Sequence, residues 1–160
     1  RDTLAIPLLS PIGNPSLVLD LMWRTLLVAV DGSPITREVL AKATDLALRY
    51  DAALHLVYVI QSGWSEGDVT RQLAIRELEE ESAAILSEAS QEIARKGCSA
   101  AIHRERGHPG NTIVELAARI NADLIVLGSV GKSQVERMLT GSVSTFVVAH
   151  SPVSTLIVKP

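Results

Sequence analysis

Small residues between 128 and 142 have a spacing that suits the binding of a phosphate. Gly128 and Gly131 follow a short apolar run, and after nine further residues come Gly141 and Ser142, where a helix is expected to begin. Glycine lets the backbone approach a phosphate closely and adopt positive φ, so that successive N–H groups can face one anion. A helix start adds unbonded N–H groups and the positive end of the helix dipole. The stretch therefore predicts an anion site built mainly from backbone.

Side chains in the same stretch could add to this site. Ser129, Ser142 and Ser144 offer hydroxyl donors, and Lys132 could neutralise an outer phosphate. Each residue also has a bland interpretation: Gly128 could end a strand, Gly141 could start a helix, and Lys132 could be a solvated loop residue. The joint spacing favours the phosphate site over these separate interpretations.

The substring Gly131-Lys132-Ser133 matches the end of the P-loop motif of NTPases. The first glycine of that motif would fall on Val126, inside an expected strand, and no convincing helix start follows Ser133. We therefore exclude a Walker-type NTPase.

The histidines and the cysteine give no sign of a metal site. His55 lies inside an expected strand, His103 and His108 bracket another, and His150 lies at a helix end, where a cation is favoured. Cys98 follows a helix-ending glycine and is interpreted as a packing residue. One cysteine forms no internal disulfide, so a reducing cytoplasm is the expected location.

The elements that must position these residues alternate along the chain. The apolar and β-branched runs predict strands at 25–30, 53–60, 98–104, 124–127 and 154–158. The segments between them predict helices at 34–50, 69–96, 111–120 and 142–149. In helix 69–96 the inward face is expected to hold Leu78, Ser82, Ile85, Ala89 and Ile93. This alternation predicts a parallel sheet of the doubly wound α/β type.

Composition agrees with this class and limits the partners. Hydrophobic residues make up 47% of the 160 residues and aromatic residues only 3%, so Val, Leu, Ile and Ala must build the core. The net charge of −3 is spread along the chain, which argues against a nucleic-acid surface. No apolar run approaches the length of a membrane helix. We expect neither nucleic acid nor membrane as a partner.

The first 21 residues differ from the rest. Pro7, Pro11 and Pro15 interrupt an apolar segment, and Met22 stands just before the first good strand. We expect 1–21 to be an irregular leader or a vector-derived segment, and 22–160 to be one domain.

The glycine pattern identifies a resemblance. Gly128-x-x-Gly131, nine residues, then Gly141-Ser142 is the pattern of the ATP-binding branch of the universal stress protein family. Further stretches resemble the same family: VAVDGS at 28–33, HLVYVI at 55–60, GHPGNTIVELA at 107–117 and STLIVK at 154–159. The resemblance covers about 22–160. Val130 stands where many relatives carry His, so a His-mediated phosphate contact is not expected.

The resemblance implies a flavodoxin-like, Rossmann-like sheet in the order 3-2-1-4-5 with helices on both faces. In that order the first and fourth strands are neighbours whose connections leave in opposite directions, and a ligand is expected outside their carboxyl ends. Asp31 ends the first strand and Gly128 ends the fourth. The topology and the glycine pattern thus select the same crevice.

The resemblance also implies roles for single residues. Ala29 and Asp31 would flank the base and ribose, with Asp31 accepting a hydrogen bond or holding a metal through water. Asp31 has an alternative role as a turn residue bonded to its local backbone. Val59 would present its backbone to adenine, and Leu127 would pack beside the base. The phosphates and ribose would be held, largely by backbone N–H groups, by Gly128, Gly131, Gly141, Ser142, Val143 and Ser144.

The function implied is an ATP-binding regulatory module, with or without Mg, that an unknown protein partner senses. The alternatives are a slow ATPase or nucleotide-transferring enzyme in the same crevice, and a flavoprotein of the same fold. The family usually forms homodimers through the last strand, 154–158, and Val153, Leu156 and Val158 suit such an interface.

Overall fold

A computed structural model describes residues 23–61, 69–131 and 141–160, apart from the side chains of 69–71. The predictions for the leader 1–21 and for Lys132 lie outside these residues. In the described parts of the chain, no helix is long and apolar enough to cross a membrane.

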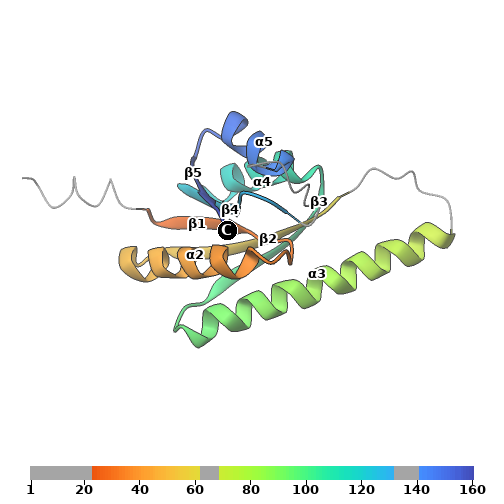
Figure 1. Ribbon diagram of the computed structural model, residues 1–160, viewed down its shortest axis with the longest axis horizontal. Coiled ribbons are helices and arrows are strands. Elements are labelled where there is room, and N and C mark those ends of the chain that lie inside the picture. The colour runs from red at the N-terminus through yellow and green to blue at the C-terminus, as the bar shows by residue number, and fades with distance from the viewer. Residues whose placement is uncertain (1–22, 62–68, 132–140) are drawn as a thin grey trace, which may run out of the picture.

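Five parallel strands form a single sheet in the order β3-β2-β1-β4-β5, which confirms the predicted fold class and strand order (Figure 1). The strands are β1 (Thr25–Ala29), β2 (Ala53–Gln61), β3 (Ala100–Gly107), β4 (Leu124–Gly128) and β5 (Ser154–Val158). The helices of the described residues are α2 (Thr36–Tyr50), α3 (Val69–Arg95), α4 (Pro109–Arg119) and α5 (Ser142–His150).

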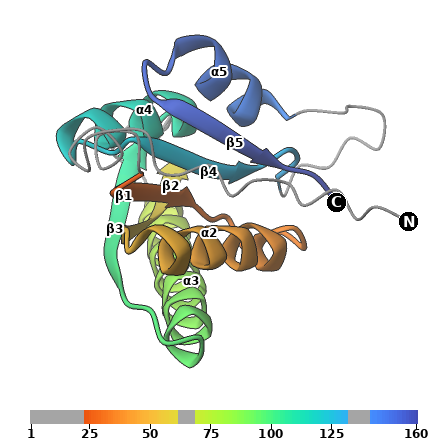
Figure 2. The ribbon, with the colours of Figure 1, turned by 90° about the vertical axis from the view of Figure 1, so that its left-hand side faces the viewer.

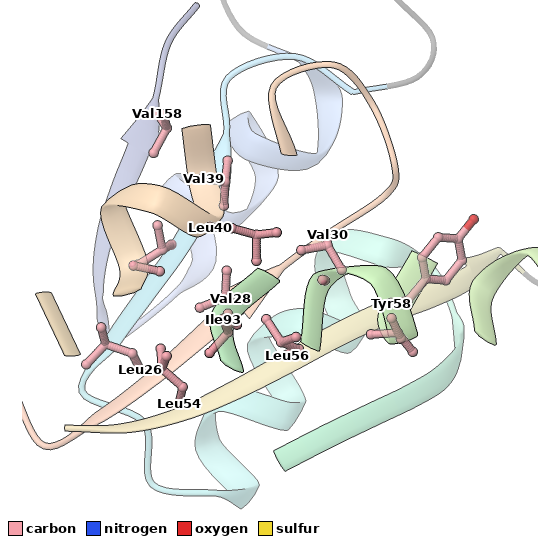
Figure 3. Close-up of a cluster of buried hydrophobic side chains, with 14 of the residues drawn as sticks. Leu26, Val28, Val30, Val39, Leu40, Leu54, Leu56, Tyr58, Ile93 and Val158 are labelled. Carbon is pink, nitrogen blue, oxygen red and sulfur yellow. The ribbon is translucent and has the colours of Figure 1, made fainter. Parts of the chain in front are cut away.

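The helices form two layers, one on each face of the sheet. Helices α2 and α3 lie on one face, and α4 and α5 lie on the other (Figure 2). Successive strand residues point to opposite faces, so Leu26 and Val28 join the core under α2 and α3 (Figure 3), while Leu27 joins the core under α4 and α5. Both faces of β1 are therefore buried, which explains why its sequence is an unbroken apolar run.

Helix α3 corrects one prediction about the core. Ser82, Ala89 and Ile93 are buried as expected, but Leu78 is 39% exposed and Leu86, which was not predicted, is 3% exposed. The N-terminal half of α3 extends beyond the sheet, so the apolar side chain at position 78 has little to pack against (Figure 1). Periodicity predicted the helix but not how much of it the sheet covers.

Several element boundaries differ from prediction by one to three residues, and two of these differences have a clear cause. Strand β3 begins at Ala100 rather than at Cys98, because Gly97 has a φ of +83° and the Cys98 N–H still bonds back to the Ile93 carbonyl. Helix α4 begins at Pro109 rather than at residue 111. Proline suits the first helical turn because that turn does not use its missing N–H group.

Candidate functional site

A cavity of about 420 Å³ lies at the carboxyl ends of β1, β2 and β4. Strands β1 and β4 are neighbours, and the helices that follow them, α2 and α5, cover opposite faces of the sheet. This is the switch point at which doubly wound sheets bind ligands. The volume falls in the range of small-molecule pockets.

The cavity wall contains every predicted site residue that the structure describes. These residues are Ala29, Asp31, Val59, Leu127, Gly128, Ser129, Gly131, Gly141, Ser142, Val143 and Ser144. Lys132 lies outside the described residues. The structure thus brings together segments around 29–31, 57–61, 127–131 and 141–144 that are separated in the sequence.

The wall also contains residues that the sequence did not predict as site residues: Val30, Ile35, Thr36, Val39, Val57, Tyr58, Gln61, Pro109, Ile113 and Val130. Val57 could have been found from Val59, because both point to the same face of β2. Pro109 and Ile113 lie one helical turn apart at the start of α4, and only the packing of α4 over β2 brings them to the cavity.

One end of the cavity is apolar and the other is polar. Ala29, Val57, Val59 and Leu127 supply aliphatic surface from three adjacent strands, and Ile113 adds to it from α4. The polar end consists of Asp31, the 128–131 turn and the first turn of α5. The cavity therefore suits a molecule with an apolar ring at one end and an anionic group at the other.

The three glycines provide space rather than unusual backbone angles. None of Gly128, Gly131 and Gly141 has positive φ, which corrects that part of the prediction. A Cβ on Gly128 would lie 2.6 Å from Ile35 Cγ2, and a Cβ on Gly131 would lie 2.8 Å from Asp31 Oδ2. A Cβ on Gly141 would lie 3.3 Å from the Ser129 carbonyl oxygen. The absence of side chains lets these segments approach one another closely.

Asp31 makes the local turn contact considered for it, and it also lines the cavity. Its Oδ1 accepts a hydrogen bond from the Ser33 N–H at 2.9 Å, and the Thr36 hydroxyl lies 3.4 Å from the same oxygen. This is the local turn role. Its Oδ2 lies close to Gly131, since a Cβ on Gly131 would be only 2.8 Å from this oxygen. The turn therefore fixes the carboxylate against the loop that follows β4.

The first turn of α5 faces the cavity with its backbone N–H groups. Gly141 is extended, with φ −74° and ψ 164°, and the Thr145 N–H donates to the Gly141 carbonyl. Among the described residues no side chain caps this helix. The first N–H groups of a helix have no acceptor within the helix, so those of Ser142, Val143 and Ser144 suit an anion.

The serines of the site differ in what their hydroxyls do. The Ser144 hydroxyl lies 2.9 Å from the Gly141 carbonyl and 3.1 Å from the Ser129 carbonyl. It thus ties α5 to the 128–131 turn, and its role as a hydroxyl donor to the ligand stays a prediction. The Ser129 hydroxyl, in contrast, is buried and finds no hydrogen-bond partner in the described chain, although the Ser129 N–H donates to the Val158 carbonyl at 2.7 Å.

The described residues hold no group of three or more His, Cys, Asp or Glu side chains that could bind a metal ion. Asp31 is the one carboxylate among the described residues that line the cavity.

Comparisons with known proteins agree with this geometry. The model of the universal stress protein family matches residues 22–159. The universal stress protein MJ0531 of Methanocaldococcus jannaschii is 34% identical over 145 residues, which cover 86% of this chain and 83% of the relative. The structure of universal stress protein UspA from Lactobacillus plantarum matches with a TM-score of 0.74 and 26% identity, covering 86% of this chain and 98% of that one. A universal stress protein solved in complex with cAMP matches with a TM-score of 0.67 and 27% identity, covering 85% and 97%.

Proposed function

The chain belongs to the universal stress protein family, and we propose that it binds ATP in the cavity between β1 and β4 and acts as a nucleotide-dependent regulatory module. One observation carries this proposal: the polar end of the cavity joins the uncapped start of α5 to a glycine-built turn. Such a pairing of backbone donors recognises phosphate. A relative of 27% identity binds cAMP, so an adenine nucleotide is a ligand class known in a similar protein.

The residues of the cavity wall suggest where the base and the phosphates of the nucleotide would lie. The adenine would lie in the apolar end, between Val59 and Leu127, with Ala29 and Asp31 near the ribose. The phosphates would lie against Gly128–Gly131 and the first turn of α5. The Ser129 hydroxyl would then gain the hydrogen-bond partner that the described chain does not give it.

Binding without fast chemistry is the function that this wall favours. Phosphoryl transfer needs a positioned nucleophile, a base and several positive charges on the transferred group. The described wall offers Asp31 as its carboxylate and no Lys or Arg, which leaves Lys132, beyond the described residues, as the nearest cation in sequence. A slow ATPase or a nucleotide-transferring enzyme in the same cavity is the alternative, with Asp31 holding Mg through water.

The nucleotide that co-purifies with the protein tests the proposal. We expect denatured protein to release ATP, identified by mass spectrometry, and stripped protein to bind ATP in a calorimetric titration with one site per chain. Protein that holds no adenine nucleotide and shows no saturable binding would contradict the proposal. Turnover faster than about 1 per second, the usual range of enzymes, would favour the enzyme instead. A yellow flavin in place of ATP would favour the flavoprotein interpretation.

We also propose a homodimer through β5, the edge strand of the sheet next to β4. An exposed edge carries backbone groups that can pair with a second copy. The contribution of Val158 must be corrected, because its side chain is only 6% exposed and packs in the core with Val28 and Val39. Leu156 and Val153 are half-buried against the two cores, so they offer less surface than their sequence suggested.

The dimer is tested by Leu156→Lys, which we expect to yield monomers in sedimentation experiments because it places a charge at the paired edge. Leu48→Lys, the same exchange at an exposed position of α2, is the control and should stay dimeric. A dimer that survives Leu156→Lys in a folded protein contradicts this interface.

The cytoplasm is the proposed location, because the one cysteine of the chain, Cys98, suits a reducing compartment.

A further inference from the structure

Two histidines form a hydrogen-bonded pair on the sheet, outside the wall of the cavity. His55 Nδ1 of β2 lies 2.9 Å from His103 Nε2 of β3, and the two rings are nearly parallel, with an angle of 17° between their planes. Between two imidazole nitrogens a hydrogen bond needs one proton, so one ring donates and the other accepts. The pair therefore depends on the number of protons that it holds.

The pair lies on the face of the sheet that α4 covers. His55 points to the same face of β2 as Val57 and Val59, and these two valines line the cavity. His103 is the register partner of Val57 in the β2–β3 ladder. The pair thus links the edge strand β3 to the part of β2 that forms the apolar end of the cavity.

The charged groups described on this face have partners other than the two imidazoles. Glu105 of β3 pairs with Arg119 of α4, and Glu115 of α4 accepts a hydrogen bond from Asn111. On β1, the register partner of His55 is the buried Leu27. Helix α5, over β4 and β5, carries His150, whose Nδ1 lies 2.8 Å from the Phe146 carbonyl.

Three protonation states follow from this geometry. With both rings neutral, one N–H donates to the other ring nitrogen. With one added proton, a charged His103 can donate its Nε2–H to the lone pair of His55 Nδ1, and the hydrogen bond is kept. A second proton, on His55 Nδ1, would place two N–H groups and two positive charges against each other, and the bond is lost.

We propose that His55 and His103 form an acid-sensitive latch that holds β3 against β2 and opens when both rings are protonated, loosening the Val57 wall of the cavity. The part of the proposal that concerns nucleotide affinity rests on the proposed function. The effect on the sheet edge does not.

The direction of the pH dependence follows from linkage. Burial lowers the pKa of His55, and the neighbouring His103 lowers it further. In the unfolded chain a histidine takes up its proton near pH 6.5. Below that pH the unfolded state binds more protons than the folded state, so the unfolding free energy falls as the pH drops from about 6.5 toward the lowered pKa of His55. The latch is therefore closed at neutral pH and weakens in mild acid.

Two conservative variants separate titration from packing. In His103→Gln the side-chain amide can replace Nε2, and in His55→Asn it can replace Nδ1, so each keeps a hydrogen-bonding group without a group that titrates. We measure urea unfolding between pH 7.5 and 5. For each unit by which the pH falls, the equilibrium constant for unfolding of the wild type should rise by up to about tenfold, because only the unfolded chain accepts the proton on His55. Both variants should show a shallower rise, and His108→Gln, on a separate contact with Phe146, should match wild type.

The outcomes distinguish the latch from a merely structural pair. Variants that lose stability equally at pH 7.5 and 5 would show packing alone and overturn the proposal. The imidazole NMR signals give a second readout: the titration midpoint of His55 should lie below 6.5, and His103→Gln should raise it. Titration of His55 at the same midpoint in both proteins would also overturn it.

ATP affinity at pH 7.5 and 5.5 tests the link to the cavity. Wild type should lose several-fold more affinity in acid than His55→Asn, and the titration of ATP itself cancels in the comparison. An equal loss overturns the link between latch and cavity. If no variant binds ATP at pH 7.5, the proposed function fails, and the urea and NMR results still decide the latch.

Discussion

The two ends of the sheet differ in whether their polar groups are hydrogen-bonded within the described chain. At the amino ends of β1 and β4, the Asp123 carboxylate accepts hydrogen bonds from the N–H groups of Arg24, at 2.9 Å, and Thr25, at 3.3 Å. The C-terminus of α2, near the same end, stops at Asp51 in the left-handed conformation, whose N–H bonds back to the Ala47 carbonyl. At the carboxyl ends, the start of α5 has no side-chain cap and the Ser129 hydroxyl has no partner among the described residues.

From this difference we expect the amino ends to contribute to stability and the carboxyl ends to ligand binding. Buried polar groups are nearly always satisfied in folded proteins, so donors left without acceptors around a cavity require an explanation. Here they surround the switch point of the sheet, where the fold already favours a ligand. We expect substitutions at the amino ends to change stability but not binding, and substitutions at the carboxyl ends to change binding.

The largest effect is expected from closing the glycine turn. Gly131→Val together with Gly141→Val places branched side chains where a single Cβ would already lie 2.8 Å from Asp31 Oδ2 and 3.3 Å from the Ser129 carbonyl. ATP affinity, measured by calorimetry, should fall by more than about 100-fold, which is roughly 2.7 kcal/mol. Circular dichroism should show that the double variant is folded. Unchanged ATP binding would remove this turn from the site.

The opposite end should respond in stability alone. Asp123→Ala leaves the Arg24 and Thr25 N–H groups without their carboxylate acceptor. Hydrogen bonds to a charged group contribute about 2 kcal/mol, so the thermal midpoint should drop by roughly 5 °C. ATP affinity should stay within twofold of wild type. A strong loss of ATP affinity in this variant would contradict the expected difference between the two ends of the sheet.

Ser129→Ala should change both properties, with opposite signs. Removing a buried hydroxyl that has no partner should raise the unfolding free energy of the nucleotide-free protein by about 0.5–1 kcal/mol. ATP should bind about tenfold more weakly because its hydrogen bond to Ser129 is lost. Ser33→Ala is the matched control, since the Ser33 hydroxyl is also buried without a described partner but lies outside the cavity wall. Equal affinity in both variants would show that Ser129 does not contact the ligand.

The smallest effect is expected at the end of α2. Asp51 has φ 52° and ψ 44°, a conformation that glycine adopts without strain. Asp51→Gly should raise the unfolding free energy in urea by about 0.5 kcal/mol and leave ATP binding unchanged. A loss of stability would mean that the Asp51 side chain makes a contact that stabilises the protein by more than the relief of backbone strain does.

The sequence predicted the order of elements because hydrophobic periodicity is a local property. It also predicted most of the cavity wall, since the pattern Gly128, Gly131, Gly141 and Ser142 marks the turn after β4 and the start of α5. It failed at Leu78 and Leu86, which lie on neighbouring faces of one helix. Which of them is buried depends on where the sheet ends beneath α3.

Other features depend on residues distant in sequence. The His55–His103 pair joins residues 48 positions apart through the register of β2 and β3, and each histidine alone looked unremarkable. The roles of Ser129 and Ser144 likewise depend on carbonyl groups of other segments.

The sequence by itself determined the α/β class, the family and the glycine pattern of the proposed phosphate site, because these depend on residue type and local spacing. Only the tertiary structure decided why the glycines are needed, since the atoms that exclude a Cβ belong to Ile35, Asp31 and Ser129. It also decided which hydroxyl is already bonded and which two histidines lie within hydrogen-bond distance of each other. Contacts of this kind are fixed by the packing of strands and helices, and no local pattern specifies that packing.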